Sequence, residues 1–212
     1  MYDLPYHKET DQAVVRAFIA EYPLAFVTGC DADLKPVATQ LPLFIDERDG
    51  RQCLSGHLMR NTDHHRAFEA NQNVLAVFTS PNAYVSGSWY SDPHTPSTWN
   101  YMSVHAHGAI RFLGRSELEQ ILIKTTRHFE NYDENSPTIF PNLPTNLTDR
   151  LMNAIVAFEI EITSLDTVFK LSQDRDAESY RSIIGKLRQT NHAGRFIATE
   201  MEKRADKLFG EN

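Results

Sequence analysis

Hydrophobic side chains recur with two different periods in the first part of the chain. From about Thr10 to Glu21 the apolar positions follow the three- and four-residue spacing of an amphipathic helix, which Tyr22-Pro23 ends. The pattern then changes to the alternation of apolar and polar residues that is typical of half-buried strands. Strands are predicted at 24–29, 37–46, 53–58 and 73–80, with a hairpin turn at Asp49-Gly50.

The longest alternating run lies between Trp99 and Gly114 and predicts one long strand. Its core face is expected to carry Met102, Val104, Ala106, Ile110 and Phe112, and its polar face Tyr101, Ser103, His105, His107 and Arg111. A helix is predicted from Ser116 to about Phe129, because Ser116 and Glu119 have the spacing of a capping box. A loop rich in Pro and Asn, a strand at 154–163 and helical structure from about Asp176 complete the chain.

This order of elements indicates the fold class. Several short strands with few helices between them do not suit a doubly wound parallel sheet, so we predict a mainly β protein, an antiparallel barrel with peripheral helices. We expect a barrel domain over residues 1–170 and a C-terminal helical extension over 171–212.

Composition and charge narrow the classes of function. The 212 residues are 41% hydrophobic and 23% charged, which is ordinary for a globular protein, and neither a signal peptide nor a long apolar run is visible. We therefore expect a cytoplasmic protein without a membrane partner, whose two cysteines are too few for a disulfide scaffold. The net charge of −7 weighs against a nucleic-acid-coating protein, and any DNA contact is expected in 175–212, where basic residues outnumber acidic ones.

The segment SWYSDPHTPSTWNYMSVHAHG, from Ser88 to Gly108, holds both tryptophans of the chain. Its aromatic residues alternate with short polar ones, so they either belong to a core or interface or form the wall of a site for a planar ring such as a flavin. His105 and His107 have a spacing that could hold a metal, but no carboxylate occupies a matching position. We predict no metal site and no catalytic acid or base.

Two shorter segments could contact a ligand. GHLMRN places Arg60 and Asn61 where a strand gives way to a helix, which suits either a phosphate group or a plain helix cap. FKLSQ places Lys170 and Gln173 after the last strand, where they could contact a ligand or close a turn.

Taken in order, seven motifs carry a resemblance to a known family: MYDLPYHKETD, LPLFID, GHLMRN, AYVSGSWY, STWNYMSVHAHG, AIVAFEIEIT and FKLSQDR. The chain resembles the PaiB family, FMN-binding negative transcriptional regulators with a flavin-reductase-like split barrel. The resemblance implies a homodimer that binds FMN near the subunit interface. It also implies ligand contacts by His57, Arg60, Asn61, Ser88, Trp89, Thr98, Trp99, Asn100, Lys170 and Gln173.

The chain departs from the family pattern at a few of these positions. Thr62 stands where a proline is expected, and Phe169 and Asp174 replace a tryptophan and an asparagine. Phe169 could still pack on a ring, whereas the carboxylate of Asp174 would weaken phosphate binding unless it points away.

Three functions are compatible with these features. The first is a flavin-dependent regulator, in which DNA binding is implied by the family and not supported by the charge. The second is a small flavin reductase or oxidoreductase with a nicotinamide donor. The third is a haem-binding split barrel with His105 and His107 as axial ligands.

Overall fold

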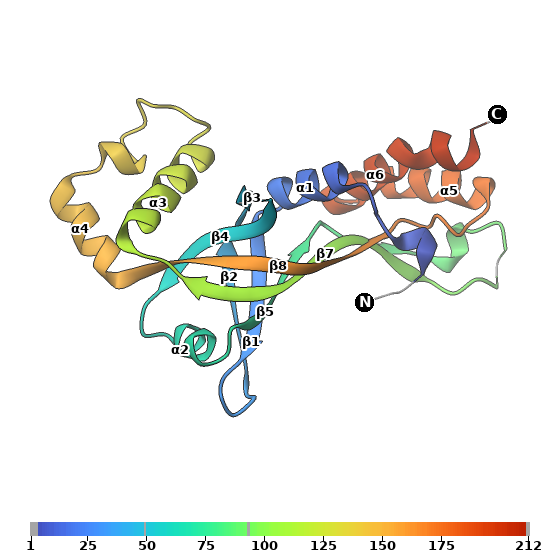
Figure 1. Cartoon of the computed structure of the whole chain (residues 1–212). Helices are drawn as coiled ribbons and strands as arrows, with labels where there is room; N and C mark the ends of the chain where they lie inside the picture. The colour runs from blue at the N-terminus through green and yellow to red at the C-terminus, as the bar shows by residue number, and fades with distance from the viewer. Residues whose placement is uncertain (1–3, 49, 93, 211–212) are drawn as a thin grey trace. The chain divides into compact units, whose positions relative to one another are not determined.

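The structure is a computed structural model that describes residues 4–48, 50–92 and 94–210 (Figure 1). The strands are β1 (Leu24–Cys30), β2 (Pro36–Pro42), β3 (Phe44–Arg48), β4 (Arg51–Met59), β5 (Asn73–Thr79), β6 (Ala83–Val85), β7 (Thr98–Phe112) and β8 (Ile155–Lys170). The α-helices are α1 (Gln12–Glu21), α2 (Asp63–Ala70), α3 (Arg115–Phe129), α4 (Thr145–Ala154), α5 (Ala177–Arg188) and α6 (His192–Phe209). Short 3-10 helices lie at η1 (Pro5–His7), η2 (Gly87–Trp89) and η3 (Phe140–Asn142).

The strands form one sheet in the order β2-β1-β5-β7-β8-β4-β3, with β6 paired to β7. The β1–β2, β1–β5, β3–β4, β4–β8 and β6–β7 pairs are antiparallel. The predicted antiparallel sheet with C-terminal helices is therefore confirmed. Asp49, in the predicted hairpin turn, lies outside the described residues, and Gly50 beside it has a φ of 75°, which favours glycine.

The chain forms two compact units. One unit contains the chain up to Phe18, Phe78–His105 and the chain from Asp166 onward, and the other contains Ile19–Val77 and Ala106–Leu165. The two longest strands, β7 and β8, contribute residues to both. The separate helical extension over 171–212 stays a prediction.

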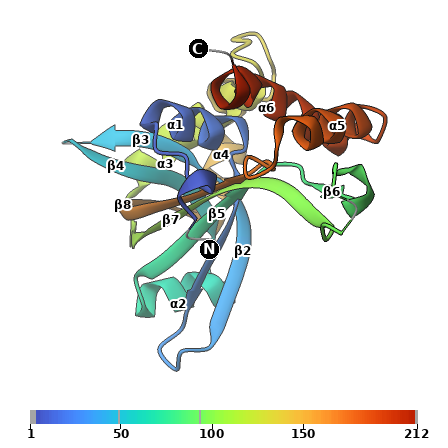
Figure 2. The same ribbon diagram turned by 90° about the vertical axis from the view of Figure 1, so that its right-hand side faces the viewer.

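In the second unit, α2 lies beside the β1–β2 hairpin (Figure 2). Its Phe68 is fully buried, and a Cβ atom added at Gly29 of β1 would come within 3.0 Å of the Phe68 ring. Glycine at this position therefore allows close packing. Farther along the chain, α3 and α4 enclose a cluster of buried apolar residues, Leu118, Ile121, Leu122, Phe140, Met152 and Ala157.

In the first unit, α5 and α6 pack against each other as a helical hairpin (Figure 1). Asp176 caps α5 and Asn191 caps α6, each through a side chain that accepts a backbone N–H three residues later. Tyr180 of α5 is fully buried, and its hydroxyl donates to the carbonyl of Met201 at 2.8 Å.

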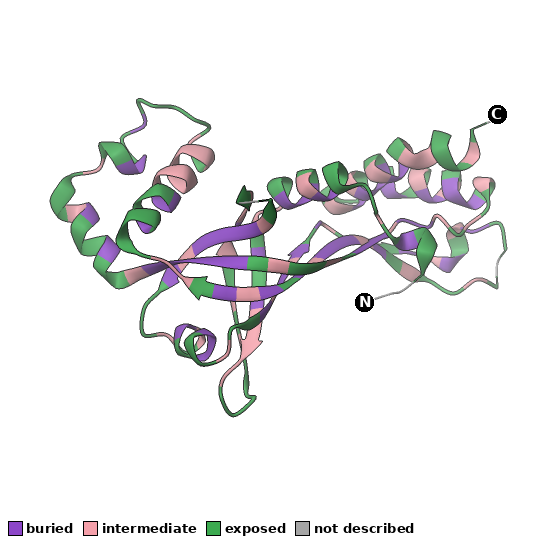
Figure 3. Ribbon diagram, in the orientation of Figure 1, coloured by how far each residue is buried: buried purple, intermediate pink, exposed green. Residues whose placement is uncertain are grey.

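The alternation predicted for the long strand is present in β7, where buried and more exposed segments follow one another (Figure 3). Met102, Val104, Ala106 and Ile110 are all at most 2% exposed. Ser103 departs from the predicted polar face: it is buried and its hydroxyl donates to the carbonyl of Phe78 at 3.0 Å. A main-chain acceptor thus satisfies a small hydroxyl inside the unit.

Several element boundaries differ from the sequence-based prediction. The Pro- and Asn-rich segment contains α4 rather than only a loop, and β8 continues to Lys170 instead of ending at Thr163. The cap of α3 is Gly114, whose carbonyl accepts the N–H of Leu118 at 3.1 Å, so the predicted capping box of Ser116 and Glu119 is wrong. Among the described residues, no helix has the length and apolar character needed to cross a bilayer.

Candidate functional site

Two exposed aromatic rings, Tyr84 of β6 and Trp99 of β7, lie next to each other on the sheet. In the β6–β7 pair, Tyr84 lies opposite Trp99 in the register. Their ring centroids are 5.7 Å apart at an interplanar angle of 69°, an edge-to-face contact. Tyr84 is 49% exposed and Trp99 is 51% exposed, so about half of each residue's surface faces solvent. Tyr84 was not among the predicted site residues, although its hairpin pairing with Trp99 places it there.

A hollow of about 280 Å³ lies beside Trp99. It is lined by Thr79, Ser80, Asn82, Trp99, Tyr101 and Met102, all within one unit. The hollow combines an exposed aromatic side chain with an exposed amide at Asn82. Stacking on the ring and hydrogen bonds to a ligand edge are the interactions that a planar heterocycle such as a flavin ring requires, so these residues fit the ring.

Ser88 and Trp89 lie in η2, just before the strand that carries Trp99. The Ser86 side chain caps η2, and its hydroxyl lies 2.9 Å from that of Ser88. Gly87 is required by packing, since a Cβ atom there would come within 2.3 Å of the Thr95 carbonyl oxygen. Ser88 is exposed and Trp89 is half-buried, so both have surface available for a ligand.

The structure brings the predicted residues Thr98 and Lys170 together. The Lys170 ammonium donates to the Thr98 hydroxyl, and burial lowers the pKa of Lys170 while the neighbouring Asp174 raises it. This contact joins the start of β7 to the end of β8.

Asn100 and Gln173 are engaged with the protein itself. Asn100 is fully buried, and its amide exchanges hydrogen bonds with the Ser172 hydroxyl at 2.9 and 3.1 Å. The Gln173 amide accepts from the Leu171 N–H at 2.7 Å and donates to the carbonyls of Phe169 and Tyr6. Both side chains therefore hold the turn after β8 in this structure.

The two family departures near this turn have local partners. Phe169 is 3% exposed and packs on the Phe18 ring at 5.2 Å and under the Arg204 guanidinium at 5.6 Å. It belongs to the core, so the expectation that it packs on a ligand ring is not met here. The Asp174 carboxylate pairs with Arg175 at 3.3 Å, which offsets its negative charge.

The GHLMRN segment lies in the other unit, where Gly56 to Met59 end β4 and Arg60 and Asn61 begin the turn to α2. The helix starts at Asp63 with Thr62 as its cap, so a strand does give way to a helix at this point, two residues after Asn61. Asn61 has a φ of 63°, and Arg66 stabilises this turn by donating to the Asn61 carbonyl at 2.8 Å. Arg60 is exposed, and its Nε donates to the carbonyl of Ile155 at 2.9 Å.

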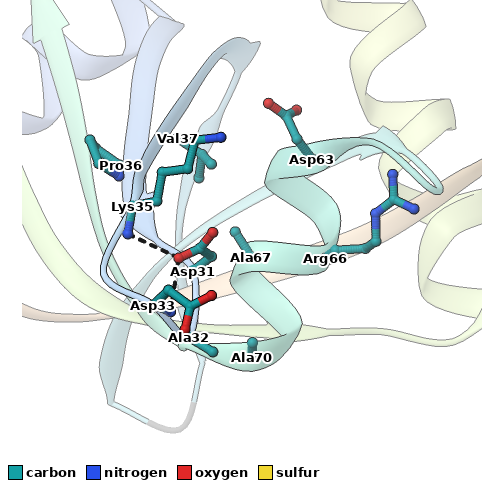
Figure 4. Close-up of a pocket in the computed structure, with 10 residues that line it drawn as sticks. All are labelled: Asp31, Ala32, Asp33, Lys35, Pro36, Val37, Asp63, Arg66, Ala67 and Ala70. Atoms are coloured by element: carbon teal, nitrogen blue, oxygen red, sulfur yellow. Dashed lines mark hydrogen bonds between the residues drawn. The ribbon is translucent and has the colours of Figure 1, made fainter.

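A carboxylate already compensates part of the positive dipole charge at the N-terminus of α2. The carboxylate of Asp63 lies in the first turn, and hydrogen bonds from His64 lower the pKa of Asp63. Beside it, a groove of about 360 Å³ separates α2 from the β1–β2 hairpin (Figure 4). Its charged residues are Asp31, Asp33, Asp63, Lys35 and Arg66. The Asp31 carboxylate accepts the N–H groups of Asp33 and Lys35, so it closes the hairpin turn.

His57, also predicted to contact the cofactor, lies on β4 opposite Ala157. Its side chain is half-buried, and burial lowers its pKa. The buried Nδ1 atom has no hydrogen-bond partner among the described residues. Within the described ranges, no group of three or more His, Cys, Asp or Glu residues is arranged to hold a metal ion.

Comparison with known proteins gives a family. Residues 1–164 match the family described as "Putative FMN-binding domain". The chain is 32% identical over 208 residues to the Bacillus subtilis "Protease synthase and sporulation protein PAI 2", covering 98% of this chain and 99% of the relative. An uncharacterised protein of Emericella nidulans is 24% identical, covering 97% of this chain.

Solved structures share the fold at low sequence identity. The "FAD and Heme binding protein" of Mycobacterium smegmatis superposes with a TM-score of 0.58 at 18% identity, covering 77% of this chain and 73% of its own. The flavocytochrome Anf3 of Azotobacter vinelandii has a TM-score of 0.57 at 18% identity, covering 80% of this chain and 72% of its own. At these identities the likeness concerns the fold.

Proposed function

Because the chain belongs to the PaiB family of FMN-binding split-barrel proteins, we propose that it is a regulator whose FMN, as ligand or redox sensor, alters a partner contact. FMN supplies the electron-transfer chemistry when it is bound, and the protein supplies binding and orientation. The relative's name, a protease synthase and sporulation protein, supports a regulatory role over a purely metabolic one.

The observation that carries this proposal is the half-exposed indole of Trp99 beside its hollow. A soluble protein gains little from leaving two large aromatic rings, Trp99 and Tyr84, half in water unless another molecule covers them. In the proposal, the flavin ring stacks on Trp99, and Ser88, Trp89 and Thr98 contact it from the same unit. Asn100 and Gln173 act by holding the turn that positions Lys170.

We propose that Arg60 binds the phosphate group of FMN and that His57 and Asn61 make further contacts with it. Arg60 is exposed beside a turn that precedes a helix, and a guanidinium forms strong charge-assisted hydrogen bonds with phosphate. The ring and phosphate assignments rest on different observations and are tested separately.

Titration of the protein with FMN and with riboflavin, followed by flavin fluorescence, tests both assignments. Trp99→Ala should weaken both ligands and change the fluorescence quenching, because both carry the ring. Arg60→Ala should weaken FMN roughly ten- to a hundredfold and leave riboflavin nearly unchanged, because one charge-assisted hydrogen bond contributes about 1.5–3 kcal/mol.

Two outcomes would contradict these assignments. Equal losses for FMN and riboflavin in Arg60→Ala would show that Arg60 supports the fold through its bond to Ile155. A folded Trp99→Ala variant with unchanged affinity for both ligands would remove the ring assignment. Tyr6→Ala, which truncates another aromatic residue of about the same exposure, serves as the control for Trp99→Ala.

A flavin reductase is the second candidate, and the open side of the Trp99 hollow favours it, since a ring bound there would remain accessible to a nicotinamide donor. Steady NAD(P)H oxidation in the presence of FMN would support this activity. No NAD(P)H oxidation, together with a salt-sensitive shift of promoter DNA, would favour the regulator.

The proposal includes the partners and the compartment. The protein is a cytoplasmic homodimer, and if it contacts DNA, it does so through residues 175–212, where basic side chains are in slight excess. Substitution of exposed Arg195 on α6 by Gln should then reduce the DNA shift, whereas Arg150→Gln on α4 should not.

A further inference from the structure

A further polar hollow lies on the sheet of the unit that contains Ile19–Val77 and Ala106–Leu165, on strands β3, β4, β7 and β8. It has a volume of about 530 Å³ and is lined by Arg48, Arg51, Cys53, Arg111, Glu159 and Glu161. The strand register explains why these residues meet. Arg51 pairs with Arg48 and Cys53 with Glu161, and paired residues of antiparallel strands project to the same face.

The centre of the cluster is the carboxylate of Glu159, which is 7% exposed. Arg111 donates to its Oε1 through Nε at 3.2 Å and Nη2 at 3.0 Å, and Arg48 Nη1 lies 3.1 Å from its Oε2. A buried carboxylate requires compensation by one positive charge, and this one has two. One positive charge is therefore in excess around Glu159.

The third arginine, Arg51, can leave its present partner and bind a ligand at small energetic cost. Arg51 Nη1 contacts Glu161 Oε1 at 2.8 Å, but the two side chains are 70% and 49% exposed. Exposed ion pairs contribute little stability, so Arg51 can exchange Glu161 for another acceptor at small cost. Burial, followed by the charge of Glu159, raises the pKa of Cys53 to about 11, so this thiol is neutral near pH 7 and adds no negative charge.

The donors also exceed the acceptors. Each guanidinium carries five N–H donors, and each carboxylate offers roughly four acceptor positions, so three arginines facing two glutamates retain unused donors. The planar fork of arginine matches an oxyanion in geometry and charge. The three arginines and two glutamates of the hollow carry a net charge of +1, so an acceptor-only oxyanion would match both the donor surplus and the sign of the charge.

We propose that this arginine hollow binds an oxyanion, either a phosphate group or a dicarboxylate, at a site distinct from the flavin. The ligand is held between Arg48, Arg51 and Arg111. The buried Glu159 fixes the orientation of Arg111 through two hydrogen bonds and forms an ion pair with Arg48. The site does not depend on the proposed flavin contacts.

Titration of the ¹⁵N-labelled full chain with inorganic phosphate, and separately with malonate, at constant ionic strength in KCl tests the proposal. We expect saturable amide shifts confined to β3, β4, β7 and β8. Arg51→Gln should weaken binding about tenfold, as expected for the loss of one charge-assisted contact. Arg51 is exposed, so this variant should fold normally. Tighter binding of phosphate would assign a phosphate ligand, and tighter binding of malonate a dicarboxylate.

Arg150→Gln, which removes an exposed arginine of the same unit outside the hollow, is the matched control and should leave the affinity unchanged. The proposal fails if the shifts do not saturate, or if Arg51→Gln binds as tightly as the wild type. It also fails if FMN displaces phosphate while riboflavin does not, because the hollow would then be the phosphate end of the flavin site. Failure of the flavin titrations alone would leave this proposal intact.

Discussion

His57 combines a half-buried imidazole with a buried Nδ1 that has no hydrogen-bond partner among the described residues. Burial lowers its pKa from the usual 6.5, so the folded state favours the neutral ring. The unfolded chain binds a proton at a higher pH than the folded chain does. The stability that His57 contributes is therefore fully present above about pH 6.5 and is lost as the pH falls through the lowered pKa.

The free energy of unfolding should accordingly fall as the pH drops from about 6.5 through the lowered pKa of His57, and His57→Gln should flatten this dependence. Urea unfolding at several pH values measures it. His7, whose pKa burial also lowers, should preserve part of the slope in the variant. The exposed His192→Gln is the control and should keep the full wild-type slope. An unchanged slope in His57→Gln would mean that its ring is well solvated in the folded protein.

The sequence predicts the exposure and strand position of a site residue where the local alternation of apolar and polar residues determines them. The exposure of Trp99 and its position on a strand follow from the pattern. Alternation also places Asn100 on the face of Met102 and Val104, and its side chain is buried there. Its hydrogen-bond partner could not be foreseen, because Ser172 lies 72 residues away. Gln173 likewise turns to the Tyr6 carbonyl, 167 residues earlier in the chain. Such long-range hydrogen bonds decide whether a polar side chain is available to a ligand.

At the scale of elements, hydrophobic periodicity predicted β7 well because its core face is continuous. The ends of elements were less predictable, because they depend on tertiary contacts. β8 continues to Lys170, where Thr167 exchanges hydrogen bonds with the main chain of Glu9. The helix α4 was missed because Pro and Asn dominate the segment before it, although Thr148 and Met152 give it a buried face.

Val104 tests the assignment of the β7 core face. Its side chain is fully buried, so Val104→Ala should lower the free energy of unfolding by roughly 1–3 kcal/mol through lost burial and a cavity. Urea unfolding monitored by tryptophan fluorescence measures this change. FMN affinity should stay the same, since Val104 faces the interior. Val14→Ala, the same truncation at a 36% exposed position on α1, should change stability by less than about 0.5 kcal/mol. A similar small effect at Val104 would contradict the core assignment.

At the scale of the whole molecule, the proposed homodimer can be tested on the exposed apolar face of β1. Leu24 is 59% exposed and Phe26 is 45% exposed, and in the sheet Phe26 lies opposite Gln40 of β2 and Val77 of β5. Neighbouring apolar side chains on a sheet face are a common feature of subunit interfaces. We therefore expect this face to be covered by a second copy of the chain.

Light scattering coupled to size-exclusion chromatography should give twice the chain mass of 24.2 kDa for the wild type. Phe26→Asp should give the monomer mass, because a two-fold interface would place the new carboxylate, and its symmetry copy, in an apolar contact without partners. Leu34→Asn is the control: Leu34 is 74% exposed at a hairpin tip with a φ of 62°, which asparagine tolerates, and the variant should remain dimeric. A wild type that is monomeric at working concentration would refute the dimer. A dimeric, folded Phe26→Asp variant would place the interface elsewhere on the sheet.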